Sequence, residues 1–234
     1  MFPKTRWFLV VLFSIAMAWM ESAAVLYLRL LTHRIQSYQS DPLPLLAGVA
    51  QVELVREVAT VLMLLAVGWL AGQTVRSRLA YFSIAFGFWD IFYYLFLIPL
   101  TGWPKSLLDW DILFLLPLPW WGPVIAPVSI SLLLITGGTL VIQFDRTERP
   151  LWPDRRVPAA CMVGAILVLY VFMSDAIRVL DQGADVIRQV LPTTFNWPLF
   201  GLGLALMALP VVNLAVLKRA KSKVPDAEGN LLRS

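Results

Sequence analysis

The sequence predicts an all-α fold: a polytopic helical membrane bundle of about six transmembrane helices, with interfacial or re-entrant helical segments on the outer side. Hydrophobic residues make up 59% of the 234 residues and charged residues only 15%, whereas soluble domains carry about 25% charged residues. The mean hydropathy is +0.74. The apolar residues also fall in long blocks, and about 20 such residues cross the hydrocarbon core as a helix. These observations exclude a soluble enzyme and a water-soluble binding domain.

Six apolar blocks reach that length. In chain order they cover residues 7–31, 48–72, 79–101, 123–143, 157–177 and 197–217. No connection between them is long enough to form a second domain. We therefore predict a single six-helix transmembrane domain over residues 1–217 and a basic cytoplasmic tail over residues 218–234.

The first block begins like a signal peptide, with Lys4 and Arg6 before an apolar stretch and small residues at Ala16 and Ala18. The apolar run continues past that possible cleavage site to Leu31, which is long enough to span a membrane. We therefore expect an uncleaved first helix.

Orientation follows from the basic residues, because Lys and Arg are enriched in cytoplasmic loops. Thirteen of the 19 basic residues flank one set of span ends and five flank the other. The larger set is Lys4, Arg6, Arg76, Arg78, Arg146, Arg149, Arg155, Arg156, Lys218, Arg219, Lys221, Lys223 and Arg233, and the smaller set is Arg29, Arg34, Lys105, Arg178 and Arg188. We predict an integral protein of a bacterial-type inner or plasma membrane with both termini in the cytoplasm.

Two connections on the outer side are predicted to be structured. Residues 175–191 place opposite charges three apart with apolar residues between them, the pattern of an amphipathic helix that Gly183 interrupts and Pro192 ends. Residues 106–116 are predicted to form a short interfacial or re-entrant helix before a Pro-rich turn. Five tryptophans suit an aromatic belt on that side: Trp103, Trp110, Trp120, Trp121 and Trp197.

Acidic residues lie deep inside three of the predicted spans. By the helical rise, Glu21, Glu57 and Asp90 each lie about 14–17 Å from an end of their span, with Glu53 one turn from Glu57. An ionisable side chain at such depth costs at least about 2.5–3.5 kcal/mol, and is paired or functional by default. We call Glu21, Glu53, Glu57 and Asp90 the acidic layer.

Arg56 is the basic residue within this layer, and we expect it to neutralise one acid and leave about three uncompensated. Such carboxylates must be protonated, meet a cation or metal, or lie in a water-filled cavity. Tyr93 and Tyr94 supply nearby hydroxyls, and Asp109 and Asp111 are predicted to form an outer mouth. Two interpretations stay open: a static ion-pair network that fixes helix register, and a functional cavity for an ion, a proton or a substrate.

The sequence lacks the residues and motifs that several kinds of cofactor and catalytic site require. With Cys161 as the single cysteine and His33 as the single histidine, no bis-histidine haem site or thiolate metal cluster can form within this chain. No phosphate-binding loop, histidine metal helix or nucleophile elbow occurs. We expect no evident cofactor and name no catalytic residue. The basic tail is topogenic and can rest on anionic lipids, so it implies no nucleic acid.

Three functions remain. The first is a cation- or proton-linked transporter or channel that uses the acidic layer. The second is a non-catalytic membrane subunit of a larger complex. The third, ranked last, is a membrane enzyme whose carboxylates act as acid/base groups or bind a hard metal that the sequence does not identify. The small size favours a homo-oligomer or partner membrane subunits besides the lipid bilayer.

Overall fold

Six long helices dominate the computed structural model, which describes residues 3–31, 49–144 and 156–222. They are α1 (Pro3–Leu31), α2 (Val49–Ala71), α3 (Val75–Thr101), α4 (Ile125–Phe144), α5 (Arg156–Arg178) and α7 (Trp197–Ser222). Each covers one predicted apolar block to within a few residues, so the prediction of an all-α fold with six apolar helices is confirmed. Helix α7 continues past the predicted boundary at 217, and the rest of the tail lies outside the described residues.

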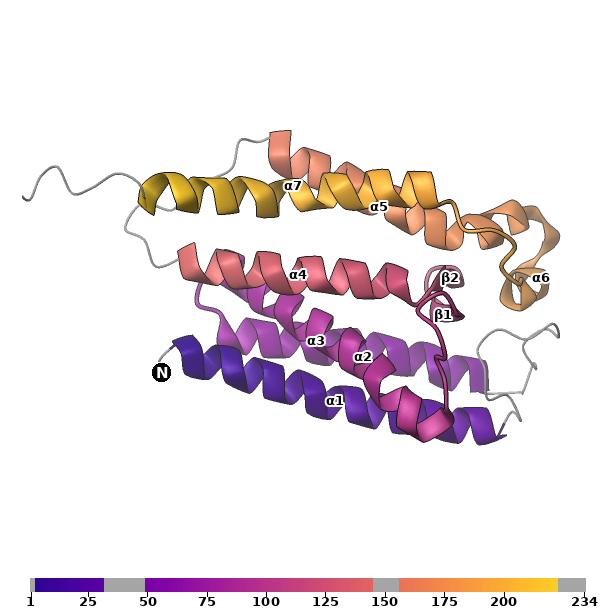
Figure 1. Cartoon of the computed structure of the whole chain (residues 1–234). Coiled ribbons are helices and arrows are strands. Elements are labelled where there is room, and N and C mark those ends of the chain that lie inside the picture. Colours follow the sequence, from indigo (N-terminus) through magenta and orange to yellow (C-terminus); the bar gives the residue numbers. More distant parts are fainter. Residues whose placement is uncertain (1–2, 32–48, 145–155, 223–234) are drawn as a thin grey trace, which may run out of the picture.

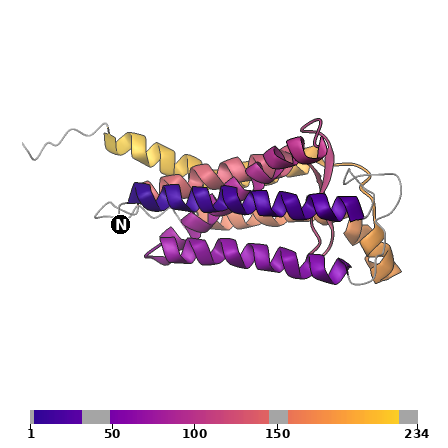
Figure 2. The same cartoon turned by 90° about the horizontal axis from the view of Figure 1, so that it is seen from below.

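The helices lie side by side, with α3 crossing its neighbours obliquely (Figure 1). Helix α3 packs against α1, α2 and α4, whereas α5 and α7 pack chiefly on each other. The α5–α7 pair meets the other helices where α7 contacts α4. Both views place the start of α1 and the end of α7 at the same end of the molecule (Figures 1 and 2). We call this end the termini end.

The opposite end holds a two-stranded antiparallel sheet, which we call the hairpin. It consists of β1 (Trp110–Phe114) and β2 (Trp120–Pro123), with a register shift between Ile112 and Phe114. The prediction of a short helix over residues 106–116 is therefore wrong. At the base of the hairpin, the backbone amides of Val124 and Ile125 donate hydrogen bonds to the carbonyl groups of Asp109 and Leu107, over 3.0 and 2.8 Å.

The hairpin is embedded among the helices instead of lying on their surface. Trp121 is 1% exposed, and its indole nitrogen donates to the carbonyl of Val190 over 3.0 Å. Trp103, just after α3, is 3% exposed. These two tryptophans were expected in the aromatic belt, and the structure places both inside the fold. Packing at this end of the molecule buries their apolar rings.

The amphipathic segment predicted over residues 175–191 is helical in two short pieces. A 3₁₀ turn, η1 (Leu180–Gln182), follows α5, and α6 (Ala184–Gln189) comes after it. The break falls at Gly183, whose φ of 98° is the left-handed conformation that glycine adopts readily. The buried carboxyl of Asp175 pairs with Arg178 and accepts a hydrogen bond from Thr193 over 3.0 Å. This contact fastens the segment after α6 back onto α5.

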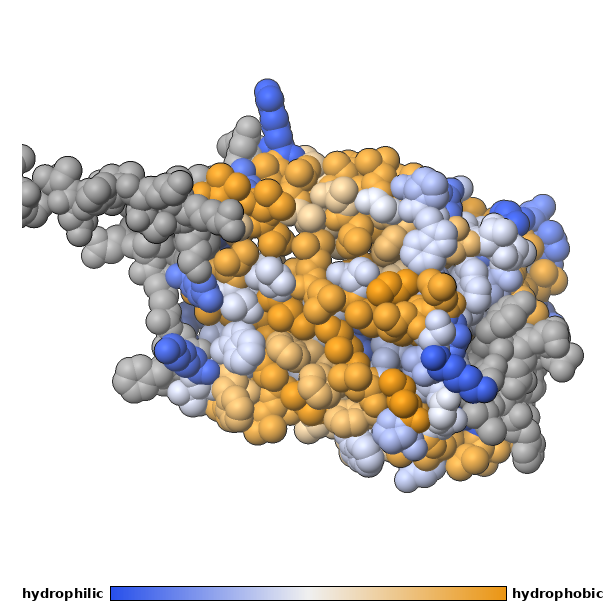
Figure 3. All heavy atoms as spheres, viewed as in Figure 1, coloured by the Kyte–Doolittle hydropathy of each residue, from blue (hydrophilic) through white to orange (hydrophobic). Residues whose placement is uncertain are grey.

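The described helices expose a largely apolar surface. Apolar residues cover most of the face in Figure 3, and hydrophilic residues lie mainly toward the two ends. Large hydrophobic side chains are exposed along α2 in particular, such as Val55 at 69% and Leu70 at 86%. Because water disfavours such a surface and hydrocarbon does not, the fold is compatible with a membrane-embedded protein.

Candidate functional site

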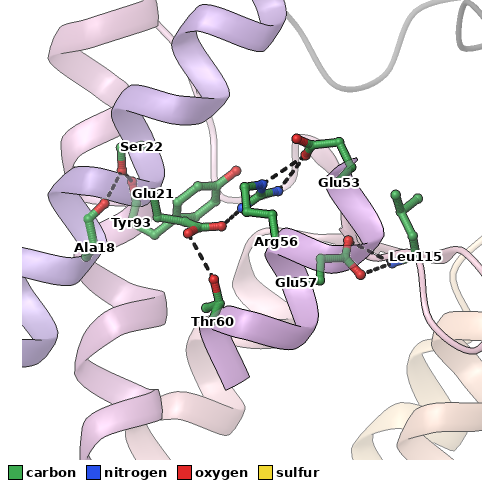
Figure 4. A network of polar contacts seen from close by, with 9 residues as sticks. All are labelled: Ala18, Glu21, Ser22, Glu53, Arg56, Glu57, Thr60, Tyr93 and Leu115. Carbon is green, nitrogen blue, oxygen red and sulfur yellow. Dashed lines mark hydrogen bonds and ion pairs between the residues drawn. The ribbon is translucent and has the colours of Figure 1, made fainter. Parts of the chain in front are cut away.

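The acidic layer lies where α1, α2 and α3 approach one another and the turn of the hairpin meets α2 (Figure 4). Glu21 on α1 and Glu57 on α2 are each 9% exposed, and Asp90 on α3 is 8% exposed. The depth read from the sequence therefore corresponds to burial in the structure. The individual partners of these carboxyls divide the layer into two parts.

The first part is the Arg56 network, made of Arg56, Glu21, Glu53 and Thr60. The guanidinium of Arg56 pairs with Glu21 across the α1–α2 contact. It also donates two hydrogen bonds to one oxygen of Glu53, over 3.0 and 2.7 Å. Thr60 donates to the second oxygen of Glu21 over 3.1 Å. The guanidinium thus engages two carboxylates, where the sequence predicted one, because its fork carries five N–H donors.

The second part consists of Glu57 and Asp90, which we call the unpaired carboxyls because neither forms an ion pair with any described residue. Both oxygens of Glu57 lie 3.0 Å from the backbone nitrogen of Leu115, immediately after β1. Arg56 is within electrostatic range of Glu57 but binds the other two acids. The contact of Glu57 is therefore with a neutral donor on the hairpin.

Asp90 is held by a neutral donor on the neighbouring helix. The hydroxyl of Ser131 on α4 donates to its carboxyl over 2.8 Å. Gly87, one turn before Asp90, makes this contact possible, because a Cβ there would lie 2.7 Å from the carbonyl oxygen of Ser131. The absence of a side chain lets the two helix backbones approach closely enough for the hydroxyl to reach Asp90.

Another buried acid, Asp111 on β1, lies within electrostatic range of Asp90. It is 2% exposed and accepts a hydrogen bond from the hydroxyl of Tyr94 over 3.0 Å. Arg29, also buried, places its guanidinium carbon 4.5 Å from the centroid of the Trp103 ring. Asp111 therefore lies inside the fold.

Asp109, the other residue predicted at the mouth, forms hydrogen bonds within its own loop. One of its oxygens accepts hydrogen bonds from the backbone amides of Lys105 and Ser106, over 2.7 and 3.2 Å. Such local bonding by an Asp side chain stabilises a turn. Both acids thus have hydrogen-bond partners nearby, and an outer mouth formed by them stays a prediction.

Tyr93 lies between the two groups of charges. Figure 4 shows its ring beside Arg56, and its hydroxyl is also within electrostatic range of Asp90, Asp111 and Arg29. Its ring stacks on that of Trp89, with centroids 6.2 Å apart. All seven residues predicted for the ion, proton or substrate site (Glu21, Glu53, Arg56, Glu57, Asp90, Tyr93 and Tyr94) thus belong to one polar region that continues into Asp111 and Arg29.

Three partners in this region were not predicted as site residues: Ser131, the backbone of Leu115, and Arg29. The sequence carried only a weak signal for them. A serine in an apolar span is common, a backbone amide has no sequence signature, and Arg29 stands near the end of its span. Among the described residues, no group of three His, Cys, Asp or Glu side chains is arranged to hold a metal ion.

Among the described residues, six helices are long and apolar enough to cross a membrane, and they enclose a layer of buried charged side chains. These features are compatible with the class of integral membrane proteins. No protein-family model, curated protein or solved structure matches the chain.

Proposed function

We propose that the chain is a proton- or cation-linked membrane transporter or channel, and that Asp90 and Glu57 are the groups that exchange the proton or cation. One observation carries this proposal: both carboxyls are buried between apolar helices. Among the described residues, their hydrogen-bond donors are neutral groups. A carboxylate in that setting is stabilised by whatever brings positive charge to it.

The Arg56 network has a different role in this proposal. Both of its carboxylates already bind a cationic side chain, and its geometry joins α1 to α2. Releasing either carboxylate would break charge-assisted contacts with the guanidinium, which is unfavourable. We therefore assign the static role to the Arg56 network and the exchanging role to the unpaired carboxyls.

Flux in proteoliposomes tests the proposal. An imposed pH gradient is followed with a trapped pH-sensitive dye, with sodium or potassium added on either side. We expect the wild-type protein to dissipate the gradient, and Asp90→Asn and Glu57→Gln to reduce the rate to that of empty liposomes. An amide keeps the volume and the hydrogen bond but cannot exchange a proton or balance a cation.

Glu53→Gln is the matched control, because Glu53 lies one turn from Glu57 on the same helix and belongs to the Arg56 network. It should retain flux in whatever fraction of the protein folds. Wild-type flux in folded Asp90→Asn and Glu57→Gln would overturn the assignment. A protein that moves no ion but copurifies in fixed stoichiometry with unrelated chains would instead be a complex subunit.

The proposal includes an orientation in which the termini end faces the cytoplasm, supported by the basic residues near that end. Single cysteines introduced at Thr147 and Asp185, in a background without Cys161, should differ in their labelling by an impermeant thiol reagent added outside cells. We expect labelling at Asp185 only. Labelling at Thr147 alone would reverse the orientation.

A further inference from the structure

The base and the turn of the hairpin are held by different kinds of polar contact. The base is joined by two backbone hydrogen bonds between residues 107–109 and 124–125, and β1 is tied to α3 by the bond from Tyr94 to Asp111. Gly122 on β2 lies so close to α5 that a Cβ there would be 2.8 Å from the ring of Phe172. At the turn, the carboxylate of Glu57 on α2 accepts hydrogen bonds from the backbone amides of Leu115 and Leu116, and Phe114 beside the turn stacks on Phe86 of α3.

The hairpin also covers two donors whose hydrogen-bonding capacity is not used. The indole N–H groups of Trp89 and Trp120 are buried and have no acceptor among the described residues. Both rings contact Phe114 at the end of β1, with centroids 6.4 and 5.2 Å from it. Burying a donor without a partner is unfavourable, so the closed position is disfavoured at this point. Movement of Phe114 would let water reach both groups.

The electrostatic surroundings of Glu57 are specific. Arg56 and Glu53 lie beside it on α2, Glu21 faces Arg56 from α1, and Tyr93 faces Arg56 from α3. On the hairpin, the neighbouring buried acid is Asp111. Because Arg56 is engaged by Glu21 and Glu53, the negative charge of Glu57 is available to the amide of Leu115. A hydrogen bond to a carboxylate is about twice as strong as one to a neutral acceptor.

We propose that the turn end of the hairpin is a lid over the acidic layer, and that the carboxylate of Glu57 holds it closed until a proton binds there. The proton comes from water and adds to a carboxylate oxygen, which removes the charge that attracts the amide of Leu115. The lid then opens, and water reaches Trp89 and the carboxyls beneath it. This inference rests on the proposed function, because it makes the exchanging group Glu57 also the group that controls access.

The position of the lid can be measured without knowing the transported ion. Spin labels are placed at Leu116→Cys on the hairpin turn and Leu70→Cys on α2, in a Cys161→Ala background; both sites are exposed, at 39% and 86%. Leu70 lies about 20 Å along α2 from Glu57 by the helical rise, which suits pulsed electron paramagnetic resonance. We expect a single narrow distance population at alkaline pH and an additional, longer one at acidic pH.

Two variants make the result decisive. Glu57→Leu should show the longer population at every pH, and Gly201→Ala in α7, where a Cβ meets nothing within 4 Å, should behave like the wild type. If Glu57→Leu does not fold, Glu57→Gln replaces it and should lose the pH response, because an amide does not titrate. A single narrow population in Glu57→Leu, or a pH response that persists in either Glu57 variant, would overturn the lid. A static hairpin with normal proton flux refutes the lid alone, whereas a moving hairpin without flux refutes the transport proposal.

Discussion

The Arg56 network and the unpaired carboxyls lie in the same layer of the fold but are stabilised in opposite ways. In the network, one guanidinium satisfies Glu21 and Glu53 with charge-assisted contacts. Glu57 and Asp90 instead receive hydrogen bonds from a backbone amide and a hydroxyl. Opposite charge stabilises a buried carboxylate by pairing with it, whereas a neutral donor positions a carboxylate and leaves its charge unbalanced. Burial alone therefore does not distinguish the two kinds of acid, but the partner does, and the proposed division into structural and exchanging acids rests on that partner.

The largest effect is expected from breaking the network at its centre. Arg56→Met removes the cation shared by the buried Glu21 and the half-buried Glu53, so we expect a loss of stability of about 3–5 kcal/mol. Thermal unfolding and yield in mild detergent measure it. Adding Glu21→Gln and Glu53→Gln to Arg56→Met should restore much of the loss, because the network then contains no charge. Wild-type stability in Arg56→Met would show that the network is not structural.

A smaller effect is expected from separating the helices that hold Asp90. In Gly87→Ala the new Cβ meets the Ser131 carbonyl oxygen at 2.7 Å. Helices α3 and α4 must then move apart, with an expected loss of about 1–3 kcal/mol, typical of overpacking. Proton flux should fall as well, because Ser131 no longer positions Asp90.

The control for this change is Gly201→Ala in α7, where a Cβ meets nothing within 4 Å. Alanine is favoured over glycine inside a helix by about 0.5–1 kcal/mol, so this variant should be neutral or slightly more stable. Equal stability of Gly87→Ala and Gly201→Ala would contradict the close α3–α4 contact.

The fold could be predicted from the sequence wherever it depends on one segment at a time. The length of an apolar block determines each of the six helices, and the change from apolar residues to Gly183 and Pro192 indicated the broken segment after α5. The hairpin was missed because its strands are short and stabilised by pairing between Trp110 and Pro123, thirteen residues apart in sequence. Strand formation of this kind depends on context more than on local propensity.

The depth of the site residues could be predicted from the sequence, but their hydrogen-bond and ion-pair partners could not. The helical rise places Glu21, Glu57 and Asp90 at a common level from sequence alone. Which side chains meet depends on the rotation and crossing of neighbouring helices, which the sequence does not specify. Arg56 therefore reached Glu21 on α1 as well as Glu53, and Asp90 met Ser131 on α4.

The smallest expected effect is a difference in stability between a variant of the unpaired carboxyls and a variant of the Arg56 network. Asp90→Asn keeps an oxygen that can accept the hydrogen bond from Ser131, so its stability should change by about 1 kcal/mol or less. Glu21→Gln removes one of the two charges that Arg56 binds, and should lower stability by about 1–3 kcal/mol. Both are conservative amides at sites with nearly equal exposure, 8% and 9%, so burial is matched and only the partner differs. Thermal unfolding of the two single variants in the same detergent provides the comparison. If Asp90→Asn is destabilised as much as Glu21→Gln, Asp90 has a charged partner in the folded protein, and its assignment as an exchanging group fails.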